Sequence, residues 1–141
     1  MKRMILALVV ALAVVALAAC GGGGGEASAP AADAIDLSAL PPAVDVETPH
    51  ALLDNPDVFL LDVREPDEYA AGHIPGITLI PMGEIPGRLS EIPTDKPVIV
   101  TCRTGNRSEQ VVEFLREMGF TNVHNMEGGI VAWAEAGYAV E

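Results

Sequence analysis

The sequence is poor in basic residues: its 141 residues hold 8 Lys and Arg against 20 Asp and Glu, a formal net charge of −12. Binding to nucleic acid needs clustered positive charge that neutralises phosphates, so this balance argues against a nucleic-acid partner. It argues equally against electrostatic docking on anionic lipid. We interpret the acidity as that of a well-solvated, soluble surface.

Cysteine and histidine are also scarce. The two cysteines are Cys20 and Cys102, and the three histidines, His50, His73 and His124, are scattered along the chain. No group of these residues has metal-ligand spacing, so we predict neither a metal site nor a cofactor. The lack of a Cys-x-x-Cys motif and of a second available thiol excludes an intramolecular disulfide mechanism.

Residues 1–19 have the layout of a secretory signal peptide, with a basic start, an apolar run over 4–16 and small residues before position 20. Cys20 follows directly, and the segment resembles the lipobox of bacterial lipoproteins. That resemblance implies cleavage before Cys20 and lipid attachment to its sulfur; an ordinary signal peptide with an incidental Cys is the alternative. We therefore expect an exported protein that is lipid-anchored to the cell membrane, at its extracytoplasmic face or in the periplasm.

Residues 20–43 are rich in Gly, Ala and Pro and begin with the run Gly21 to Gly25. Such a composition predicts a flexible tether between the lipidated Cys20 and a folded domain over 44–141. Loss of the signal peptide removes Lys2 and Arg3 from the 8 bases. Six bases then stand against 20 acids, a net charge of −14.

Within 44–141, strand-like apolar runs alternate with helix-like segments. The predicted strands are 44–46, 58–63, 77–80, 97–101 and 122–124. The predicted helices are a short one that begins at Thr48 as N-cap, 65–71, 106–118 with Val111, Phe114, Leu115 and Met118 on its buried face, and 130–136, besides a helical or irregular stretch over 84–92. This alternation predicts an α/β sandwich around a mainly parallel sheet of about five strands. Functional sites in such sheets lie beyond the carboxyl ends of the strands, and Cys102 follows one of these ends.

Chemistry is expected in the loop that follows the strand 97–101. Its sequence is Cys102, Arg103, Thr104, Gly105, Asn106, Arg107 and Ser108, and a helix begins within it. Such a turn can aim several backbone N–H groups at one point, and the start of a helix adds positive potential. A sulfur at that point is favoured as thiolate, so we expect its pKa to be lowered. Arg103 and Arg107 flank this sulfur, which the alternative of a merely buried cysteine does not explain.

Three segments resemble the signatures of the rhodanese family. The first is Leu-Asp-Val-Arg-Glu-Pro at 61–66 with Glu-Tyr at 68–69 and Gly-His-Ile-Pro-Gly at 72–76, the second is the 102–108 loop, and the third is Glu-Gly-Gly-Ile at 127–130 with Ala-Trp at 132–133. The resemblance covers 44–141 and implies a three-layer α/β domain in which Cys102 carries a persulfide. Ile77 and Leu79 depart from the usual pattern, but they lie away from the loop.

Some residues of these signatures have a structural interpretation. Asp62 and Arg64 are expected to close a strand end as a buried ion pair, in support of the site rather than in catalysis. We expect His73 to fix a turn and Trp133 to lie in the core.

These observations predict a sulfurtransferase that works as a monomer. The Cys102 thiolate would take sulfane sulfur from thiosulfate or a similar small anionic donor, attracted by Arg103 and Arg107 within the anion-binding loop 103–108. A thiol, cyanide or a partner protein would accept that sulfur. A non-enzymatic persulfide carrier or partner-binding module is the alternative. A phosphatase or arsenate reductase fits less well, because the phosphatase signature has five residues between Cys and Arg and Arg107 comes after four.

Overall fold

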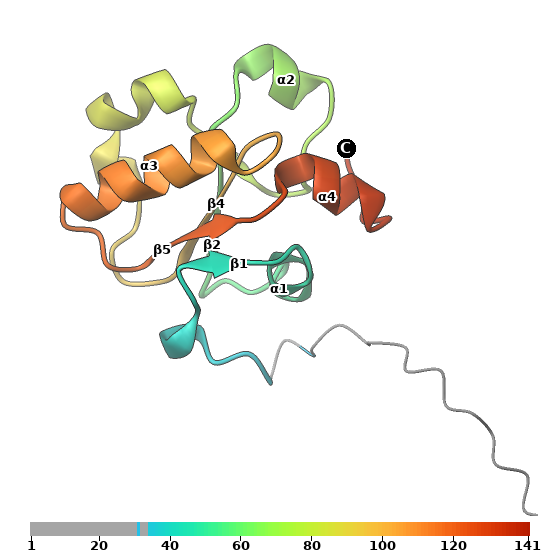
Figure 1. Ribbon diagram of the computed structural model, residues 1–141, viewed down its shortest axis with the longest axis horizontal. Coiled ribbons are helices and arrows are strands. Elements are labelled where there is room, and N and C mark those ends of the chain that lie inside the picture. The colour runs from blue at the N-terminus through green and yellow to red at the C-terminus, as the bar shows by residue number, and fades with distance from the viewer. Residues whose placement is uncertain (1–30, 32–33) are drawn as a thin grey trace, which may run out of the picture.

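The computed structural model describes Ala31 and residues 34–141. The predicted signal peptide, Cys20 and most of the predicted tether lie outside the described residues. The strands are β1 (Ala43–Val44), β2 (Phe59–Asp62), β3 (Thr78–Leu79), β4 (Val98–Thr101) and β5 (Val123–Met126). The α-helices are α1 (Glu47–Ala51), α2 (Pro66–Ala70), α3 (Asn106–Glu117) and α4 (Gly129–Glu135) (Figure 1). The described residues also form the 3-10 helices η2 (Leu37–Ala39), η3 (Met82–Gly87) and η4 (Leu89–Glu91).

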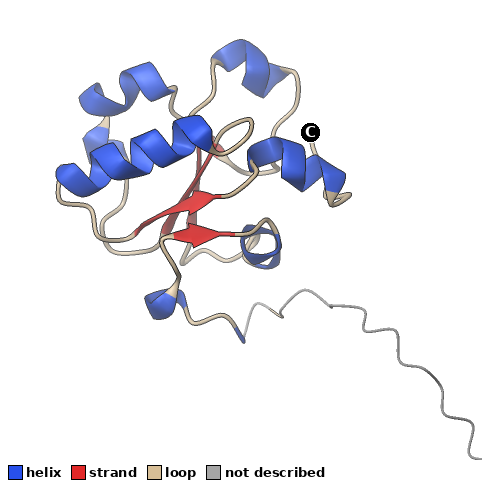
Figure 2. Ribbon diagram, in the orientation of Figure 1, coloured by secondary structure: helices blue, strands red, loops and turns tan. Residues whose placement is uncertain are grey.

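The five strands form one sheet in the order β1-β5-β4-β2-β3 (Figure 2). Every neighbouring pair is parallel. The predicted parallel α/β fold of about five strands is thereby confirmed. The carboxyl ends of all strands meet at one edge of the sheet, and Cys102 directly follows β4 there.

The central strands bury side chains on both faces of the sheet, which explains their unbroken apolar runs. Successive residues point to opposite faces. Leu61 and Val100 therefore pack on one face with α3 and η3, while Leu60 and Ile99 pack on the other face with α1 and α4. Two helical layers thus enclose the sheet, and Trp133 lies fully buried in the second.

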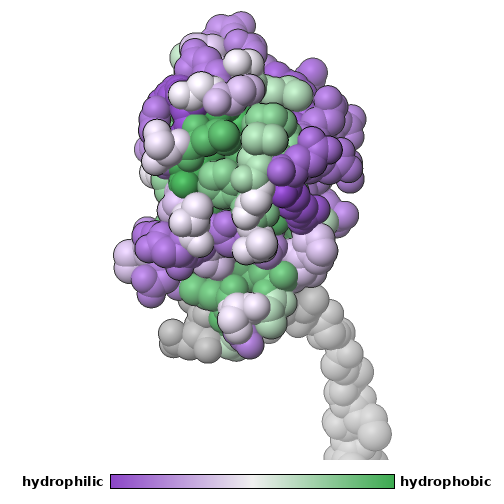
Figure 3. Space-filling model, turned by 90° about the vertical axis from the view of Figure 1, so that its left-hand side faces the viewer, coloured by the Kyte–Doolittle hydropathy of each residue, from purple (hydrophilic) through white to green (hydrophobic). Residues whose placement is uncertain are grey.

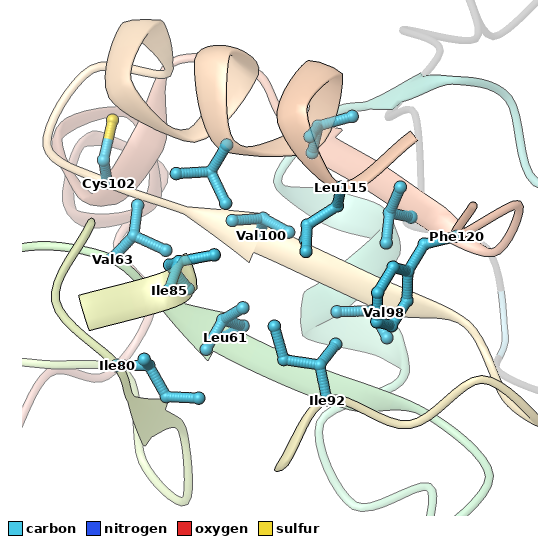
Figure 4. Close-up of a cluster of buried hydrophobic side chains, with 13 residues drawn as sticks. Leu61, Val63, Ile80, Ile85, Ile92, Val98, Val100, Cys102, Leu115 and Phe120 are labelled. Carbon is cyan, nitrogen blue, oxygen red and sulfur yellow. The ribbon is translucent and has the colours of Figure 1, made fainter. Parts of the chain in front are cut away.

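The hydrophobic cluster between the sheet and α3 ends at Cys102, the first residue of the 102–108 loop. Figure 4 shows Cys102 at the end of β4, beyond Val100 and beside Val63. The sulfur therefore rests on a closely packed apolar base, which limits how far the residue can shift.

The buried face of α3 differs from the predicted one at its last turn. Met118 is 50 % exposed, whereas Val112 is buried. The helix ends at Glu117, and the chain turns at Gly119, which has a φ of +96°. Phe120 then folds back so that its N–H donates to the carbonyl of Leu115, and its ring enters the core in place of Met118.

Most element boundaries also differ from the prediction, by one or two residues. The first strand is Ala43–Val44 rather than 44–46, and the last is Val123–Met126 rather than 122–124. Helix α1 begins one residue before Thr48, so Thr48 is not its N-cap. The carboxylate of Asp45 instead accepts hydrogen bonds from the N–H and the hydroxyl of Thr48, at 3.0 and 2.9 Å.

The N-terminal segment of the described domain lies at the amino ends of the strands. Leu37 and Leu40 line a pocket together with residues 94–97 and 121–122, which precede β4 and β5. The chain thus enters the domain at the pole opposite Cys102. Figure 3 shows the side that is left in Figure 1, where apolar areas are broken up by hydrophilic residues. Among the described residues, no helix has the length and apolar character needed to span a bilayer.

Candidate active site

The sulfur of Cys102 lies inside a ring of hydrogen-bond donors. The residue is 1 % exposed. The N–H of Gly105 donates to its Sγ at 3.1 Å, and the hydroxyl of Ser108 lies 3.4 Å from it. Backbone N–H groups of Thr104 and Ser108 also lower the pKa of this thiol. The geometry expected for the loop, in which several donors face one point, is present.

These donors favour the thiolate form of Cys102. Burial alone would raise the pKa of this thiol, because a charged sulfur loses its hydration. The Ser108 hydroxyl and the backbone N–H groups of Ser108, Thr104 and Gly105 act in the opposite direction, and together they hold the pKa of Cys102 below its ordinary value. This lowered pKa agrees with the expectation from the sequence.

Ser108 connects the sulfur to the neighbouring strand. Its hydroxyl lies 2.6 Å from Oδ1 of Asn125 and 3.0 Å from the carbonyl of Gly105, besides the sulfur of Cys102. A hydroxyl has one proton, so these acceptors compete for it. A thiolate carries a full charge, and charge-assisted hydrogen bonds are the stronger ones. The proton is therefore available to the sulfur when the sulfur is ionised.

The carbonyl groups of the loop are held by helix α4. The N–H of Ile130 donates to the carbonyl of Cys102 at 2.9 Å, and the N–H of Val131 donates to that of Arg103 at 3.1 Å. Gly129 makes this approach possible, since a Cβ there would lie 2.5 Å from backbone atoms of Cys102 and Arg103. The carbonyl of Arg103 shares its peptide plane with the N–H of Thr104, so its contact with α4 helps to direct that N–H at the sulfur.

Arg107 is not a free positive charge. Both of its terminal nitrogens donate to the carboxylate of Glu68 in α2, each at 2.7 Å. This pairing lowers the pKa of Glu68 to about 2 and raises that of Arg107. Arg103, by contrast, is exposed and forms no ion pair within residues 34–141. Of the two arginines predicted to supply positive charge in the loop, only Arg103 therefore lacks a carboxylate partner among the described residues.

Asp62 and Arg64 form a buried ion pair at the end of β2. Their side chains meet at 2.7 Å and are 1 % and 5 % exposed. The guanidinium of Arg64 also donates to the carbonyls of Glu68 and Gly72, at 3.2 and 2.9 Å. The pair thus fastens α2 to the sheet, in line with the structural role that we expected for it.

The remaining predicted residues take outer positions. Thr104 and Asn106 expose their side chains on the loop. The ring of His73 stacks on that of Tyr69 with 3.8 Å between centroids, and its Nδ1 lies 3.0 Å from the carbonyl of Tyr69. These contacts hold His73 against α2, two residues before the turn at Pro75 and Gly76. Among the described residues, no group of three or more His, Cys, Asp or Glu gathers as metal ligands would.

Two residues of the site were missing from the sequence-based prediction. Asn125 reaches Ser108 from β5, where it pairs in register with Val100 of β4. No local motif marks Asn125, because that register is a property of the assembled sheet. Glu68 belongs to a recognised signature, yet its partner Arg107 is 39 residues away.

Comparison with known proteins agrees with this fold. The family profile of the rhodanese-like domain matches residues 45–136. A sulfurtransferase of Allochromatium vinosum is 46 % identical over 89 residues, which cover 63 % of this chain and 83 % of that protein. The thiosulfate sulfurtransferase GlpE of Pseudoalteromonas translucida is 41 % identical over 88 residues, or 62 % of this chain and 83 % of that protein.

A solved structure gives the same result. The crystal structure of a rhodanese-related protein from Thermoplasma volcanium superposes with a TM-score of 0.65 at 35 % identity, over 70 % of this chain and 96 % of that one. The chain belongs to the rhodanese-like domain family, and both of the relatives described above are named sulfurtransferases.

Proposed function

We propose that this protein is an exported, membrane-tethered sulfurtransferase that works through a persulfide on Cys102. It would move sulfane sulfur from thiosulfate or a similar donor to cyanide, a thiol or a protein. The observation that carries this proposal is the buried Cys102 sulfur, which hydrogen-bond donors from Gly105 and Ser108 surround. The family and the sulfurtransferase relatives support the same chemistry.

The reaction has two halves. The thiolate of Cys102 attacks the outer sulfur of thiosulfate, a new S–S bond forms, and the old S–S bond breaks as sulfite leaves with the electron pair. An acceptor nucleophile then attacks the outer sulfur of the persulfide, and the Cys102 thiolate returns. Both enzyme forms carry a negative charge inside the same ring of donors, which stabilises it as an oxyanion hole stabilises oxygen. A preformed thiolate needs no general base.

Intact-mass measurement tests this proposal. The chain over residues 21–141 is reduced, incubated with thiosulfate and compared with its Cys102→Ser variant. We expect the mass to rise by one sulfur atom, to return on addition of cyanide, and to stay constant in the variant. An unchanged mass of the unsubstituted chain would reject thiosulfate as a donor.

Steady-state turnover separates an enzyme from a persulfide carrier. An enzyme with thiosulfate and cyanide as its two substrates should show ping-pong kinetics. A carrier would form the persulfide and then turn over only with a partner protein present.

Membrane tethering rests on the sequence of residues 1–20 alone. We expect the full-length protein to sediment with membranes after expression in a bacterium that processes lipoproteins, and a Cys20→Ser variant to lose this association. Equal membrane association of both forms would contradict lipid anchoring through Cys20.

A further inference from the structure

The hydroxyl of Ser108 has one proton and three acceptors around it. Oδ1 of Asn125 lies 2.6 Å from its Oγ, the carbonyl oxygen of Gly105 lies 3.0 Å away, and the sulfur of Cys102 lies 3.4 Å away. Ser108 is 0 % exposed and Asn125 is 8 % exposed, so little solvent reaches this contact. Two oxygen atoms at 2.6 Å need a proton between them. The contact with Asn125 therefore holds the proton of Ser108 while the sulfur is uncharged.

A charged sulfur changes this arrangement. The thiolate draws the proton of Ser108 to itself, because charge-assisted hydrogen bonds are the stronger ones. The carbonyl of Gly105 keeps a partner when the proton leaves, since it also accepts from the N–H of Glu109 at 3.0 Å. Oδ1 of Asn125 has no second donor within residues 34–141 and would face a lone pair of the hydroxyl oxygen. The amide orientation that suits a neutral thiol therefore opposes the thiolate.

A half turn of the Asn125 amide removes this conflict. The backbone of Asn125 is fixed, because its N–H donates to the carbonyl of Pro42 at 3.0 Å and the residue pairs in register with Val100. Rotation about the last side-chain bond of an asparagine is soft and roughly two-fold, and it exchanges an acceptor for a donor. Nδ2 can thus replace Oδ1 at Ser108 without displacement of the strand. The amide then donates to the hydroxyl oxygen, and the hydroxyl donates to the sulfur.

The outer end of the amide allows both orientations. Every fully buried side-chain nitrogen or oxygen of the described residues has a hydrogen-bond partner. Nδ2 of Asn125 has none within those residues, so it is not fully buried. Asn125 lines a polar pocket of about 290 Å³ beside Thr104 and Glu127. Solvent in that pocket can accept from Nδ2 or donate to Oδ1, so neither orientation leaves the outer atom unsatisfied.

We propose that Asn125 is a positioning residue for Cys102 whose amide turns with the charge on the sulfur. Oδ1 accepts from Ser108 beside a neutral thiol, and Nδ2 donates to Ser108 beside a thiolate or persulfide. The proposal rests on the sulfurtransferase function proposed above, since it assigns a residue that supports both charged forms of the same sulfur. Hydrogen bonds in such a chain polarise and strengthen one another.

Charged groups surround the loop on several elements, but none bonds to this chain of hydrogen bonds. They are Arg103, Arg107 and Glu109 on the loop and α3, Glu68 on α2, the Asp62–Arg64 pair at the end of β2, and Glu127 after β5. Helix α4 has no acidic side chain in its first turn. A substitution of the neutral amide by an apolar group leaves all these charges in place. A change in the pKa of Cys102 then reports the amide itself.

The test is the rate of Cys102 alkylation by iodoacetamide against pH, in the chain over residues 21–141, where Cys102 is the sole cysteine. In Asn125→Leu the neutral thiol loses little, because the proton of Ser108 turns to the carbonyl of Gly105. The thiolate loses the donor behind the hydroxyl. We expect alkylation at neutral pH to slow about threefold, the worth of one hydrogen bond, and to recover as the pH rises. A fixed acceptor that competes for the proton predicts the opposite sign, since its removal would speed alkylation.

The double variant shows whether Asn125 acts through Ser108. If it does, Asn125→Leu with Ser108→Ala should be slowed about threefold, like each single variant, and not about ninefold as independent effects would give. Asn122→Leu is the matched control. It removes a partly buried amide just before β5, whose Nδ2 donates to the carbonyls of Pro93 and Lys96. We expect the alkylation of Cys102 in Asn122→Leu to depend on pH as in the unsubstituted chain.

A second measurement needs no variant of Asn125 that folds. The side-chain amide protons of Asn125 are followed by NMR against pH in the unsubstituted chain. One of them should move to lower field at the midpoint of Cys102 ionisation, when Nδ2 begins to donate to Ser108. The shift should be absent in Cys102→Ser, whose hydroxyl does not ionise.

The outcomes separate this inference from the function on which it rests. If thiosulfate and other sulfane donors leave the mass of the unsubstituted chain unchanged, the proposed function fails, while alkylation and NMR still report on Asn125. Unchanged or faster alkylation in Asn125→Leu overturns the role of its amide. A ninefold loss in the double variant, or an Asn125 amide that does not respond to the ionisation of Cys102, overturns it as well.

Discussion

Two helices begin at the Cys102 loop, and they serve it in different ways. Helix α3 follows Gly105, with a φ of +98°, and the loop directs N–H groups of Gly105 and its neighbours at the sulfur. Helix α4 follows Gly128, with a φ of +74°, and its first N–H groups bind the loop carbonyls of Cys102 and Arg103. One helix start meets the sulfur, and the other holds the first peptide groups of the loop, one of which carries the N–H of Thr104.

The comparison shows that an anion site needs more than donors. A peptide plane whose N–H points inward has its carbonyl pointing outward, and that carbonyl needs a partner when it is buried. Helix α4 supplies that partner from its unsatisfied N-terminal N–H groups. The loop and α4 therefore form one unit, although Gly129 comes 26 positions after Arg103 in the sequence.

Gly129→Ala is expected to have the largest effect. Its Cβ would lie 2.5 Å from the carbonyl oxygens of Cys102 and Arg103, so α4 must move away from the loop. We expect a loss of about 3 kcal/mol in the free energy of unfolding, as for overpacked cores, and no measurable persulfide formation. Urea unfolding and intact mass measure the two effects.

Gly137→Ala is the control for this change. Gly137 lies just after α4 with a φ of +80°, and nothing lies within 4 Å of its Cβ position. It should cost about 1 kcal/mol from backbone strain alone. An equal loss in the free energy of unfolding in both variants would show that the contact between α4 and the loop does not stabilise the site.

Gly105→Ala should have an intermediate effect and test the other helix start. Gly105 and Gly119 flank α3 with almost the same φ, +98° and +96°. A Cβ on Gly105 would lie 3.2 Å from the N of Gly128, whereas nothing lies near that of Gly119. We expect Gly119→Ala to cost about 1 kcal/mol and Gly105→Ala about 1 kcal/mol more. Persulfide formation should slow in Gly105→Ala alone, and a slowed Gly119→Ala would contradict this assignment.

Ser108→Ala should have the smallest effect, and it concerns the charge on the sulfur. Loss of the hydroxyl removes a contribution that lowers the pKa of Cys102, so the thiolate appears only at higher pH. Alkylation of Cys102 by iodoacetamide should be about threefold slower at neutral pH, the worth of one hydrogen bond, and should recover as the pH rises.

Thr101→Val controls for the loss of a buried hydroxyl. Thr101 donates to the carbonyl of Cys102 at 3.1 Å and not to its sulfur. In Thr101→Val, the rate of Cys102 alkylation should depend on pH as it does in the unsubstituted chain. A shift of the same size in both variants would mean that Ser108 acts on packing rather than on the sulfur.

Local features of the sequence were sufficient to predict much of this arrangement. The strand before Cys102, the glycine in the loop and the start of α3 are neighbours in the chain, so their pattern predicts an anion-binding turn. The partners of the loop are not neighbours. Asn125, Glu68 and Gly129 reach it through strand register and helix placement, which the order of residues does not reveal. Met118 shows the same limit, because helical periodicity cannot tell that Phe120 folds back over the helix end.

Because neighbouring strands are all parallel, their amino ends lie at one edge of the sheet and their carboxyl ends at the other. The N-terminal chain enters beside the loops that precede β4 and β5, while the sulfur lies past the opposite end of β4. If lipid at Cys20 holds that N-terminal chain at a bilayer, the tether is attached to the domain at the amino ends of the strands. The point of attachment and the Cys102 loop then lie at opposite ends of the sheet, so the tether itself would not cover the loop.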